Sequence, residues 1–158
     1  MKTAAVVTVS DSCSRRERAD ISGPAVADVL RQNRFDVTQQ EIVPDEQSRI
    51  EAALLRLCDR VQLVVTTGGT GIAERDVTPE ATREVCPKLI DGIPEKMRLA
   101  GLQQTPLAAL SRGLCGVHGR TLILNLPGSP NAAVQSLQAV IEILPHALDL
   151  LAGITTHK

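Results

Sequence analysis

The residues of this sequence best suited to chemistry are a cluster of glycines and the acidic side chain that follows it. Three glycines fall within the stretch Thr67-Gly68-Gly69-Thr70-Gly71, and Asp76 comes shortly afterwards, next to Arg75. Glycines let the backbone approach a ligand closely and present its N–H groups to an anion. A carboxylate beside a bound phosphate needs a cation between them, and Mg²⁺ commonly bridges the two. The pattern indicates a phosphate site in which Asp76 binds magnesium.

The glycines by themselves fit a simple tight turn between a strand and a helix equally well. They match neither the G-x-x-x-x-G-K-[ST] phosphate loop nor the G-x-G-x-x-G dinucleotide pattern. The neighbouring Arg75 and Asp76 favour the phosphate site. The run Thr78-Pro79-Glu80 predicts the start of a helix with Thr78 as its N-cap. Asp76 is therefore expected to have no capping role.

Asp45 is the second acidic candidate, and its position also has a purely structural explanation. It lies where the N-cap of a helix over residues 46–58 is expected, and spacing alone favours capping over a ligand role. Asp11 lies in the polar run Ser10-Asp11-Ser12, where it can brace its own loop through an Asx turn. Neither carboxylate is assigned to chemistry by its spacing.

No arrangement for nucleophilic catalysis by a side chain stands out. Cys115 and His118 are three residues apart in a predicted strand, which places them on opposite faces and rejects them as a ligand pair. His146 and His157 have no partner in the sequence, and no serine lies in a nucleophile elbow. Phosphoryl chemistry relies mainly on positioning and charge neutralisation, and an anionic nucleophile needs no histidine base.

The first half of the chain alternates strands and helices. Strands are predicted over residues 2–9, 35–43 and 61–66, and helices from Gly23, over 46–58 and over 79–85. This alternation predicts right-handed crossovers and a parallel sheet with helices on both faces. Ligands bind at the carboxyl ends of the strands in such sheets. The loops that carry Asp11, Asp45 and the glycines each follow a strand and are expected to meet at one edge.

The second half is less regular. We expect a helix over 93–99, a strand over 107–111 and a hairpin of 114–117 and 121–126 that turns at His118-Gly119. The run Asn125-Leu126-Pro127-Gly128-Ser129 is again a strand end followed by a glycine turn, and Ser129 is the predicted cap of the helix that starts at Pro130. This helix should break near Pro145. We expect one domain over residues 1–154 and a frayed tail over 155–158.

Composition narrows the classes of function. The chain has 158 residues, of which 43% are hydrophobic, a net charge of −1 and a single aromatic residue, Phe35. Nucleic-acid binders normally carry a basic stripe or aromatic stacking platforms, so nucleic acid is not an expected partner. No apolar run approaches the roughly 18 residues of a membrane helix, and the start is too short for a convincing signal peptide. We therefore expect no membrane association and a cytoplasmic location.

The cysteines do not form a recognisable framework. They are far apart, without C-x-x-C spacing, at Cys13, Cys58, Cys86 and Cys115. This spacing favours neither a disulfide scaffold nor a zinc site. Isolated buried or half-buried thiols are expected instead.

The motifs together resemble those of a known family. The glycine loop and the following Arg75-Asp76-Val77-Thr78-Pro79-Glu80 closely resemble the signature of the molybdopterin adenylyltransferases of molybdenum-cofactor biosynthesis, the type represented by MogA, MoaB and the G domain of gephyrin. Five further segments resemble family motifs in the family's order: Ser10-Asp11-Ser12, Ser22-Gly23-Pro24, Val43-Pro44-Asp45-Glu46, Leu110-Ser111-Arg112 and Asn125-Leu126-Pro127-Gly128-Ser129-Pro130. The similarity extends nearly from end to end.

This resemblance implies a three-layer α/β/α fold and a defined reaction. The terminal phosphate of molybdopterin attacks the α-phosphorus of ATP in the presence of Mg²⁺, which gives adenylylated molybdopterin and pyrophosphate. By matching position, Asp45 and Asp76 correspond to the acidic residues of catalysis and metal binding, with their division of roles open. The resemblance assigns the nucleotide to Gly68–Gly71 and Pro127–Ser129, and the pterin side to Ser10, Asp11, Ser111 and Arg112. Thr67 and Asn125 complete the set of binding candidates.

The resemblance also has implications for partners. It implies a homo-oligomer, a trimer in preference to a hexamer, and a hand-over of the product to a molybdate-inserting protein. An alternative of a different class is a molybdopterin-binding or carrier protein of the same fold without catalysis. The segment 92–98 lacks the aromatic residue that many relatives carry nearby, which leaves the pterin contacts there open.

Overall fold

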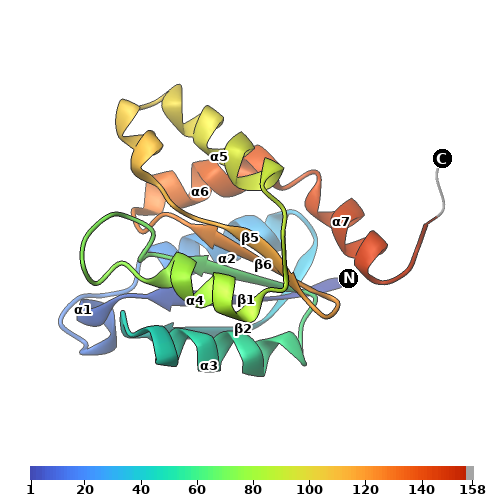
Figure 1. Ribbon diagram of the computed structural model, residues 1–158, viewed down its shortest axis with the longest axis horizontal. Coiled ribbons are helices and arrows are strands. Elements are labelled where there is room, and N and C mark those ends of the chain that lie inside the picture. The colour runs from blue at the N-terminus through green and yellow to red at the C-terminus, as the bar shows by residue number, and fades with distance from the viewer. Residues whose placement is uncertain (156–158) are drawn as a thin grey trace.

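The computed structural model describes residues 1–155, and within them one sheet forms the centre of the molecule (Figure 1). Its strands run in the order β2-β1-β3-β6-β5-β4. The strands are β1 (Lys2–Val9), β2 (Phe35–Val43), β3 (Leu63–Thr67), β4 (Lys88–Leu89), β5 (Cys115–His118) and β6 (Thr121–Leu126). The strands β2, β1, β3 and β6 are parallel to one another, whereas β5 pairs antiparallel with both β6 and β4. The mostly parallel sheet and the hairpin are both confirmed.

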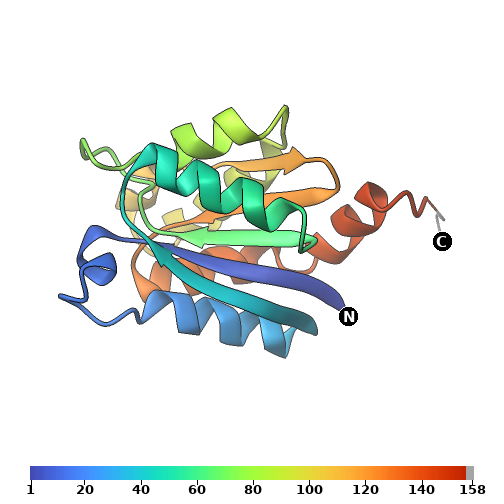
Figure 2. The same cartoon turned by 90° about the horizontal axis from the view of Figure 1, so that it is seen from below.

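Helices cover both faces of this sheet (Figures 1 and 2). They are α1 (Asp11–Ser14), α2 (Ser22–Gln32), α3 (Gln47–Cys58), α4 (Thr78–Val85), α5 (Gly92–Leu102), the 3-10 helix η1 (Pro106–Leu110), α6 (Pro130–Val140) and α7 (Leu144–Leu151). Successive side chains of a strand point to opposite faces, so β1 feeds two cores. Ala4 and Val6 pack with α2, α5, α6 and α7, whereas Ala5 and Val7 pack with α3 and α4. The result is the expected three-layer α/β/α arrangement.

The topology gathers the candidate loops. Because β1, β2, β3 and β6 are parallel, their carboxyl ends meet at the same edge, which lies on the left in Figure 1. The loops that follow these strands carry Asp11, Asp45, the glycines and Gly128 respectively. The predicted convergence of these segments at one edge is confirmed.

The structure differs from several local predictions. Residues 107–111 were expected to form a strand, but Pro106–Leu110 form η1, because Pro106 suits a first helical turn and the Thr105 hydroxyl accepts the Leu107 N–H at 3.2 Å. The polar segment after β1 contains the one-turn helix α1, whose N-cap Ser10 accepts the Cys13 N–H. The two-residue strand β4 was not expected.

The C-terminal helices follow the prediction closely. Ser129 is the N-cap of α6, and its hydroxyl accepts the Ala132 N–H at 3.2 Å. The helical run is interrupted between Val140 and Leu144, before Pro145, and ends ahead of Gly153. Thr155 is exposed, and the remainder of the predicted frayed tail, residues 156–158, lies outside the described residues.

The thiols form no disulfide within residues 1–155, as expected. All four are free cysteines, with Cys58 half-buried and the other three buried. Burial raises the pKa of the Cys58 thiol to about 11 and that of the Cys86 and Cys115 thiols to about 12. A thiol reacts as its thiolate, and a raised pKa leaves little thiolate at neutral pH, so these three side chains are unreactive. Among residues 1–155, no helix is both long and apolar enough to cross a membrane.

Candidate functional site

Two hollows open at the edge where the loops meet. The first, of about 600 Å³, lies between the ends of β1, β2 and β3 and the start of α2, and its lining includes Ser10, Asp45, Thr67 and Gly68. The second, of about 530 Å³, lies between the glycine loop, α5, η1 and α6. Four residues line both hollows: Gly69, Asp76, Gly128 and Ser129. These four residues form the shared wall between the hollows.

The glycine loop can take its shape only with glycine at two positions. Gly68 has φ +103° and a Cβ there would stand 2.3 Å from the Val9 carbonyl oxygen, while Gly69 has φ +70°. Both values of φ lie in a region that side chains other than glycine rarely adopt. The Gly68 N–H donates to the Leu126 carbonyl oxygen at 3.1 Å, which ties the glycine loop to the loop after β6. The backbone of these two loops therefore lies bare at the shared wall.

The N-caps predicted at Thr78 and Asp45 are wrong, and the structure shows what these two side chains do instead. Thr78 is the first residue of α4 after the N-cap Val77, and its buried hydroxyl donates to the Gly68 carbonyl oxygen at 2.9 Å. Thr78 thus fixes the glycine loop instead of capping. Glu46 is the N-cap residue of α3, without a side-chain hydrogen bond, so Asp45 is not needed as a cap.

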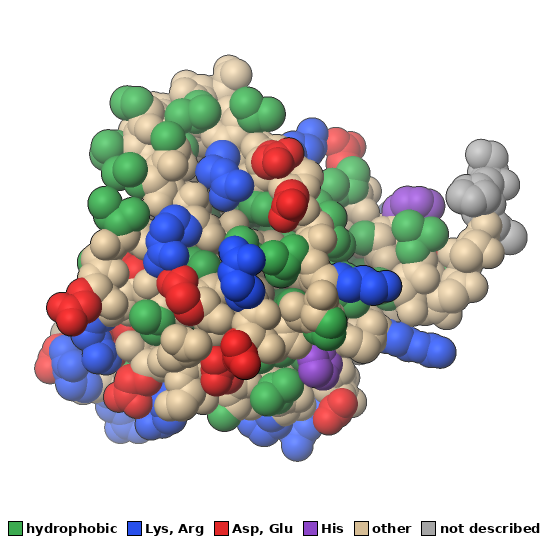
Figure 3. Space-filling view, in the orientation of Figure 1, with side chains coloured by type: hydrophobic (Ala, Val, Ile, Leu, Met, Phe, Trp, Pro, Cys, Tyr) green, Lys and Arg blue, Asp and Glu red, His purple; other side chains and the backbone are tan. Residues whose placement is uncertain are grey.

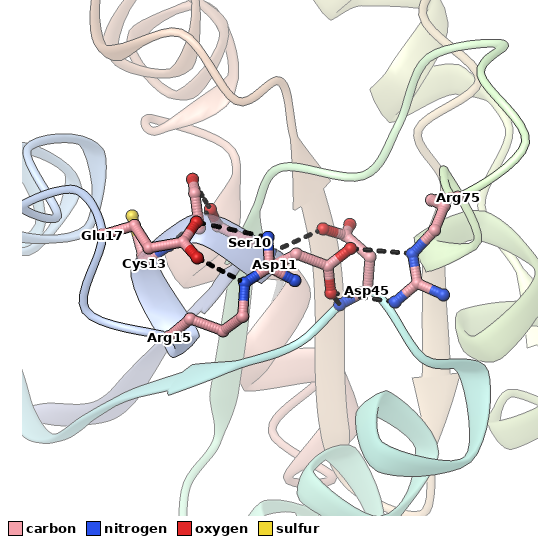
Figure 4. Close-up of polar contacts among 8 residues, drawn as sticks. Ser10, Asp11, Cys13, Arg15, Glu17, Asp45 and Arg75 are labelled. Carbon is pink, nitrogen blue, oxygen red and sulfur yellow. Dashed lines mark hydrogen bonds and ion pairs between the residues drawn. The ribbon is translucent and has the colours of Figure 1, made fainter.

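Asp45 instead forms a reciprocal pair with Asp11 (Figure 4). The Asp45 Oδ2 accepts the Asp11 N–H, and the Asp11 Oδ1 accepts the Asp45 N–H, both at 2.9 Å. Burial raises the pKa of the Asp45 carboxyl, and the charges of Asp11 and Asp76 act in the same direction, partly opposed by the Asp11 amide. The Arg75 guanidinium holds the pKa of Asp11 below its ordinary value. The site therefore crowds carboxylates from three loops around one edge.

Asp76 lies in the shared wall and braces its own loop. Its Oδ2 accepts the Ala73 N–H at 3.0 Å, and its backbone oxygen accepts a hydrogen bond from Arg112 at 2.8 Å. As predicted, it caps no helix. Asp45 and Asp76 both line the first hollow, where the charge of Asp76 reaches Asp45.

These two carboxylates fit a magnesium ion. Within residues 1–155 no group of three or more His, Cys, Asp or Glu side chains is arranged to hold a metal. Mg²⁺ typically takes one or two carboxylates and completes its coordination with water and substrate phosphates. A pair of like charges held in one partly buried hollow gains from a cation between them. Asp45 and Asp76 match this donor set.

Arg112 holds the glycine loop from outside the hollows. Its guanidinium donates to the Gly71 and Asp76 carbonyl oxygens at 2.8 Å each and to the Glu80 carboxylate at 2.9 Å. Its own N–H donates to the Thr70 carbonyl oxygen. Arg112 lines neither hollow, and its contacts give it a role in the shape of the loop.

The predicted binding residues divide between the two hollows. Ser10, Thr67 and Gly68 line the first; Thr70, Gly71, Ser111 and Pro127 line the second; Gly69, Gly128 and Ser129 line both. Asp11, Arg112 and Asn125 line neither. Asn125 is fully buried, where its amide donates to the hydroxyls of Thr66 and Thr82 and its Oδ1 accepts the Leu114 N–H.

Sequence reasoning assigned no site role to four polar residues that line the first hollow, namely Thr8, Arg18, Asp20 and Ser22. The Asp20 carboxylate accepts the Thr8 hydroxyl at 2.7 Å and the Gly23 N–H at 2.9 Å, which fixes the start of α2. An acidic residue three positions before a Gly-Pro helix start is a recognisable capping signal. In the second hollow, Met97 and Arg98 were left open by the sequence and line it from α5.

Comparison with known proteins identifies the family. Residues 5–146 match the family model described as "Probable molybdopterin binding domain". The chain belongs to this molybdenum-cofactor biosynthesis family. It is 43% identical to the molybdopterin adenylyltransferase of Helicobacter pylori J99, over 94% of this chain and 86% of that protein. It is 39% identical to the molybdopterin adenylyltransferase of Escherichia coli K12, over 94% and 84% respectively.

Solved structures of the family agree with the fold. The molybdopterin biosynthesis enzyme MoaB from Thermus thermophilus superposes with a TM-score of 0.91 at 52% identity, over 97% of this chain and 98% of that one. The resemblance inferred from the six motifs is confirmed. The matched residues of the family model include every loop of the two hollows.

Proposed function

We propose that this protein is a molybdopterin adenylyltransferase, which transfers AMP from ATP to the terminal phosphate of molybdopterin and releases pyrophosphate. Relatives at 39% and 43% identity carry this name. The observation that carries the proposal is the shared wall, where two hollows of similar size meet at bare glycine backbone and Asp76. A reaction that joins two substrates through their phosphates needs two adjoining pockets with an anion site between them.

In this proposal the phosphates lie at the shared wall and the two heterocycles lie on either side. A phosphate oxygen of molybdopterin attacks the α-phosphorus of ATP, a new P–O–P linkage forms, and the bond to the β-phosphate breaks so that pyrophosphate leaves. The nucleophile is already an anion, so no histidine base is required. Gly69, Gly128 and their neighbours offer N–H groups to the phosphates. Ser10 and Ser111 line different hollows, so we assign them to different substrates in place of the common pterin side that the resemblance implied.

Magnesium is part of this proposal. Asp45 and Asp76 would hold the ion, and when bound it neutralises phosphate charge that would otherwise oppose the approach of two polyanions. The half-burial of Asp45 keeps one carboxylate in a region where water screens charge less. Asp76, in the shared wall, lies between both substrates.

The test is to mix the protein with ATP, Mg²⁺ and molybdopterin and to measure pyrophosphate and adenylylated molybdopterin. We expect both products in equal amounts, and none when molybdopterin is omitted. The alternative is a carrier that binds molybdopterin without catalysis. Tight binding of molybdopterin with no pyrophosphate would establish the carrier and overturn the enzyme.

Association and partners complete the proposal. Exposed leucines gather over α5 and η1, namely Leu99, Leu102, Leu107 and Leu110, in the upper left of Figure 3. Exposed apolar side chains gathered in one region mark interaction sites and support a homo-oligomer, for which we propose a trimer. A light-scattering mass distinguishes it from a hexamer. We further propose hand-over of the product to a molybdate-inserting protein and, because the reaction consumes ATP, a cytoplasmic location.

A further inference from the structure

Asp11 is the centre of a polar network that joins three loops (Figure 4). Its backbone N–H donates to Asp45, and its side chain accepts the backbone N–H of Asp45. The same carboxylate forms a bidentate ion pair with Arg75, with Nε at 2.7 Å from Oδ2 and Nη2 at 2.9 Å from Oδ1. Arg75 belongs to the segment that carries Asp76. Asp11 thus connects the two loops that bear the proposed metal ligands.

The network fixes which way the Asp45 carboxylate faces. Its Oδ2 is held by the Asp11 amide, while its Oδ1 faces the glycine loop, 3.2 Å from the position that a Cβ on Gly69 would occupy. Within residues 1–155, no hydrogen bond to Oδ1 is present. One oxygen of Asp45 is therefore anchored and the other is directed at the shared wall.

Arg75 also balances the charge of the network. Asp11, Asp45 and Asp76 are close enough for Asp11 and Asp76 both to disfavour ionisation of Asp45, whereas Arg75 favours it. Arg75 is 58% exposed and Asp11 is 21% exposed, so the pair lies at the rim with the carboxylate on the inner side. A planar guanidinium that pairs with both oxygens fixes the orientation of its partner better than a single contact does.

We infer that Asp11 and Arg75 are positioning residues which act as one unit to hold Asp45 directed at the shared wall. Neither touches the substrates. This inference rests on the proposed function, and it differs from the assignment of Asp11 to the pterin side that the family resemblance implied. It explains why Asp11 lines neither hollow although it follows a residue that does.

The test is a double-mutant cycle of Asp11→Ala and Arg75→Ala, read by kcat and KM for pyrophosphate release. Mutation of a residue that orients a metal ligand typically lowers metal affinity or activity by about 10- to 100-fold. We expect each variant to lower kcat by about 10-fold or more, with KM for both substrates within about two-fold of the parent. The double variant should be no slower than Asp11→Ala, because residues that act as a unit are not additive. Asp11→Asn, which keeps an oxygen for the Asp45 N–H, should restore part of kcat.

A matched control comes from Arg56, which makes the same kind of two-pronged pair with Glu41 at a similar exposure, but away from the hollows. Arg56→Ala should leave kcat and KM unchanged. A second readout does not depend on turnover: electron paramagnetic resonance of Mn²⁺ with ATP and no molybdopterin. The affinity for Mn²⁺ should fall about 10-fold in Asp11→Ala and Arg75→Ala and stay unchanged in Arg56→Ala.

Three results would overturn the inference. A rise in KM with unchanged kcat would make Arg75 or Asp11 a direct substrate contact. Additive effects in the double variant would separate the two residues, and a parental Mn²⁺ affinity in both single variants would remove the link to Asp45. If the parent protein makes no pyrophosphate, the proposed function fails, and the Mn²⁺ measurement still decides the positioning role. Thermal unfolding of each variant identifies any that is not folded, in which case Arg75→Gln and Asp11→Asn replace the alanine variants.

Discussion

Gly128 lies directly against Gly68, because a Cβ on Gly128 would stand 3.3 Å from the Gly68 Cα. The two residues follow β6 and β3, which are neighbours in the sheet. A side chain on Gly128 would press against the backbone of Gly68, so the two glycine turns pack main chain against main chain. The site is therefore shaped more by main chain than by side chains.

The first prediction concerns the glycine loop. Gly68→Ala forces an alanine to φ +103° and places its Cβ 2.3 Å from the Val9 carbonyl oxygen. We expect a loss of about 2 to 5 kcal/mol of unfolding free energy, the sum of a backbone penalty and a clash. Urea unfolding measures it. Gly119→Ala is the control, since Gly119 has φ +60° but nothing within 4 Å of its Cβ position, and it should cost about 1 to 2 kcal/mol. Equal losses in the two variants would contradict the clash.

Asp76→Asn should abolish adenylyl transfer and leave the fold intact. The asparagine oxygen still accepts the Ala73 N–H, so the loop keeps its brace, while the charge that a magnesium ion needs is gone. We expect pyrophosphate release to fall about 100-fold or more, with an unchanged thermal midpoint. Glu74→Gln, at an exposed position in the same loop, should retain full activity. Substantial turnover by Asp76→Asn would refute its role.

Asp45→Asn tests the charge of Asp45 alone, because the structure removes helix capping as an alternative explanation. Asp45 caps no helix, and an asparagine there can still accept the Asp11 N–H. Loss of activity would then report loss of the charge. We expect kcat to fall about 10-fold or more at unchanged stability, measured by steady-state kinetics and urea unfolding in parallel. A variant with full activity would leave Asp76 as the sole acidic residue of the reaction.

Arg112→Lys tests whether this residue shapes the loop or binds the substrates. A lysine cannot replace the three sets of hydrogen bonds that the guanidinium makes to Gly71, Asp76 and Glu80. We expect amide hydrogens of residues 71–77 to exchange faster, by about 10-fold or more, in protein without substrates. Hydrogen exchange followed by mass spectrometry measures this. Exchange at the parental rate together with a raised KM would instead assign Arg112 to substrate binding.

The Asp11–Arg75 pair predicts a pH dependence of stability. Hydrogen bonding to Arg75 lowers the pKa of Asp11 from its ordinary 3.8 in the folded protein. The pair therefore contributes fully above the unfolded value of 3.8, and its contribution is lost as the pH falls through the lower folded pKa. The free energies of unfolding of the parent and of Arg75→Gln, measured in urea, should differ at pH 6. They should converge as the pH falls through the folded pKa of Asp11. High salt should reduce the difference at pH 6, because Arg75 is exposed. A difference that grows on acidification would contradict this account.

The sequence predicted correctly those strands and helices whose hydrophobic residues recur with a regular period. The strands over 2–9 and 35–43 have the predicted bounds. The hairpin also forms, with its turn at Gly119-Arg120, one residue later than predicted. The apolar run near 107–111 was assigned the wrong type, since short apolar runs do not separate strand from helix. Pro106 was the better signal.

The site was harder to predict because its contacts are distant in sequence. Local rules favour Asp45 over Glu46 as the N-cap, because aspartate is a preferred capping residue and glutamate is not. The outcome depends on Asp11, which is 34 residues away and whose backbone N–H donates a hydrogen bond to the Asp45 carboxylate. The roles of Arg112 and Asn125 likewise depend on partners more than ten residues away. Family motifs located these residues, but only the packed structure separates those that line the hollows from those that support them.

The shared wall has a consequence for turnover. In the proposed reaction each substrate occupies one hollow, whereas the joined product occupies both. Linking two ligands makes the second contact intramolecular, which can raise affinity by about 10² to 10⁴ without any new contact. The product would thus bind more tightly than either substrate does alone. Such a protein would act as a reservoir that retains the joined product until another protein collects it.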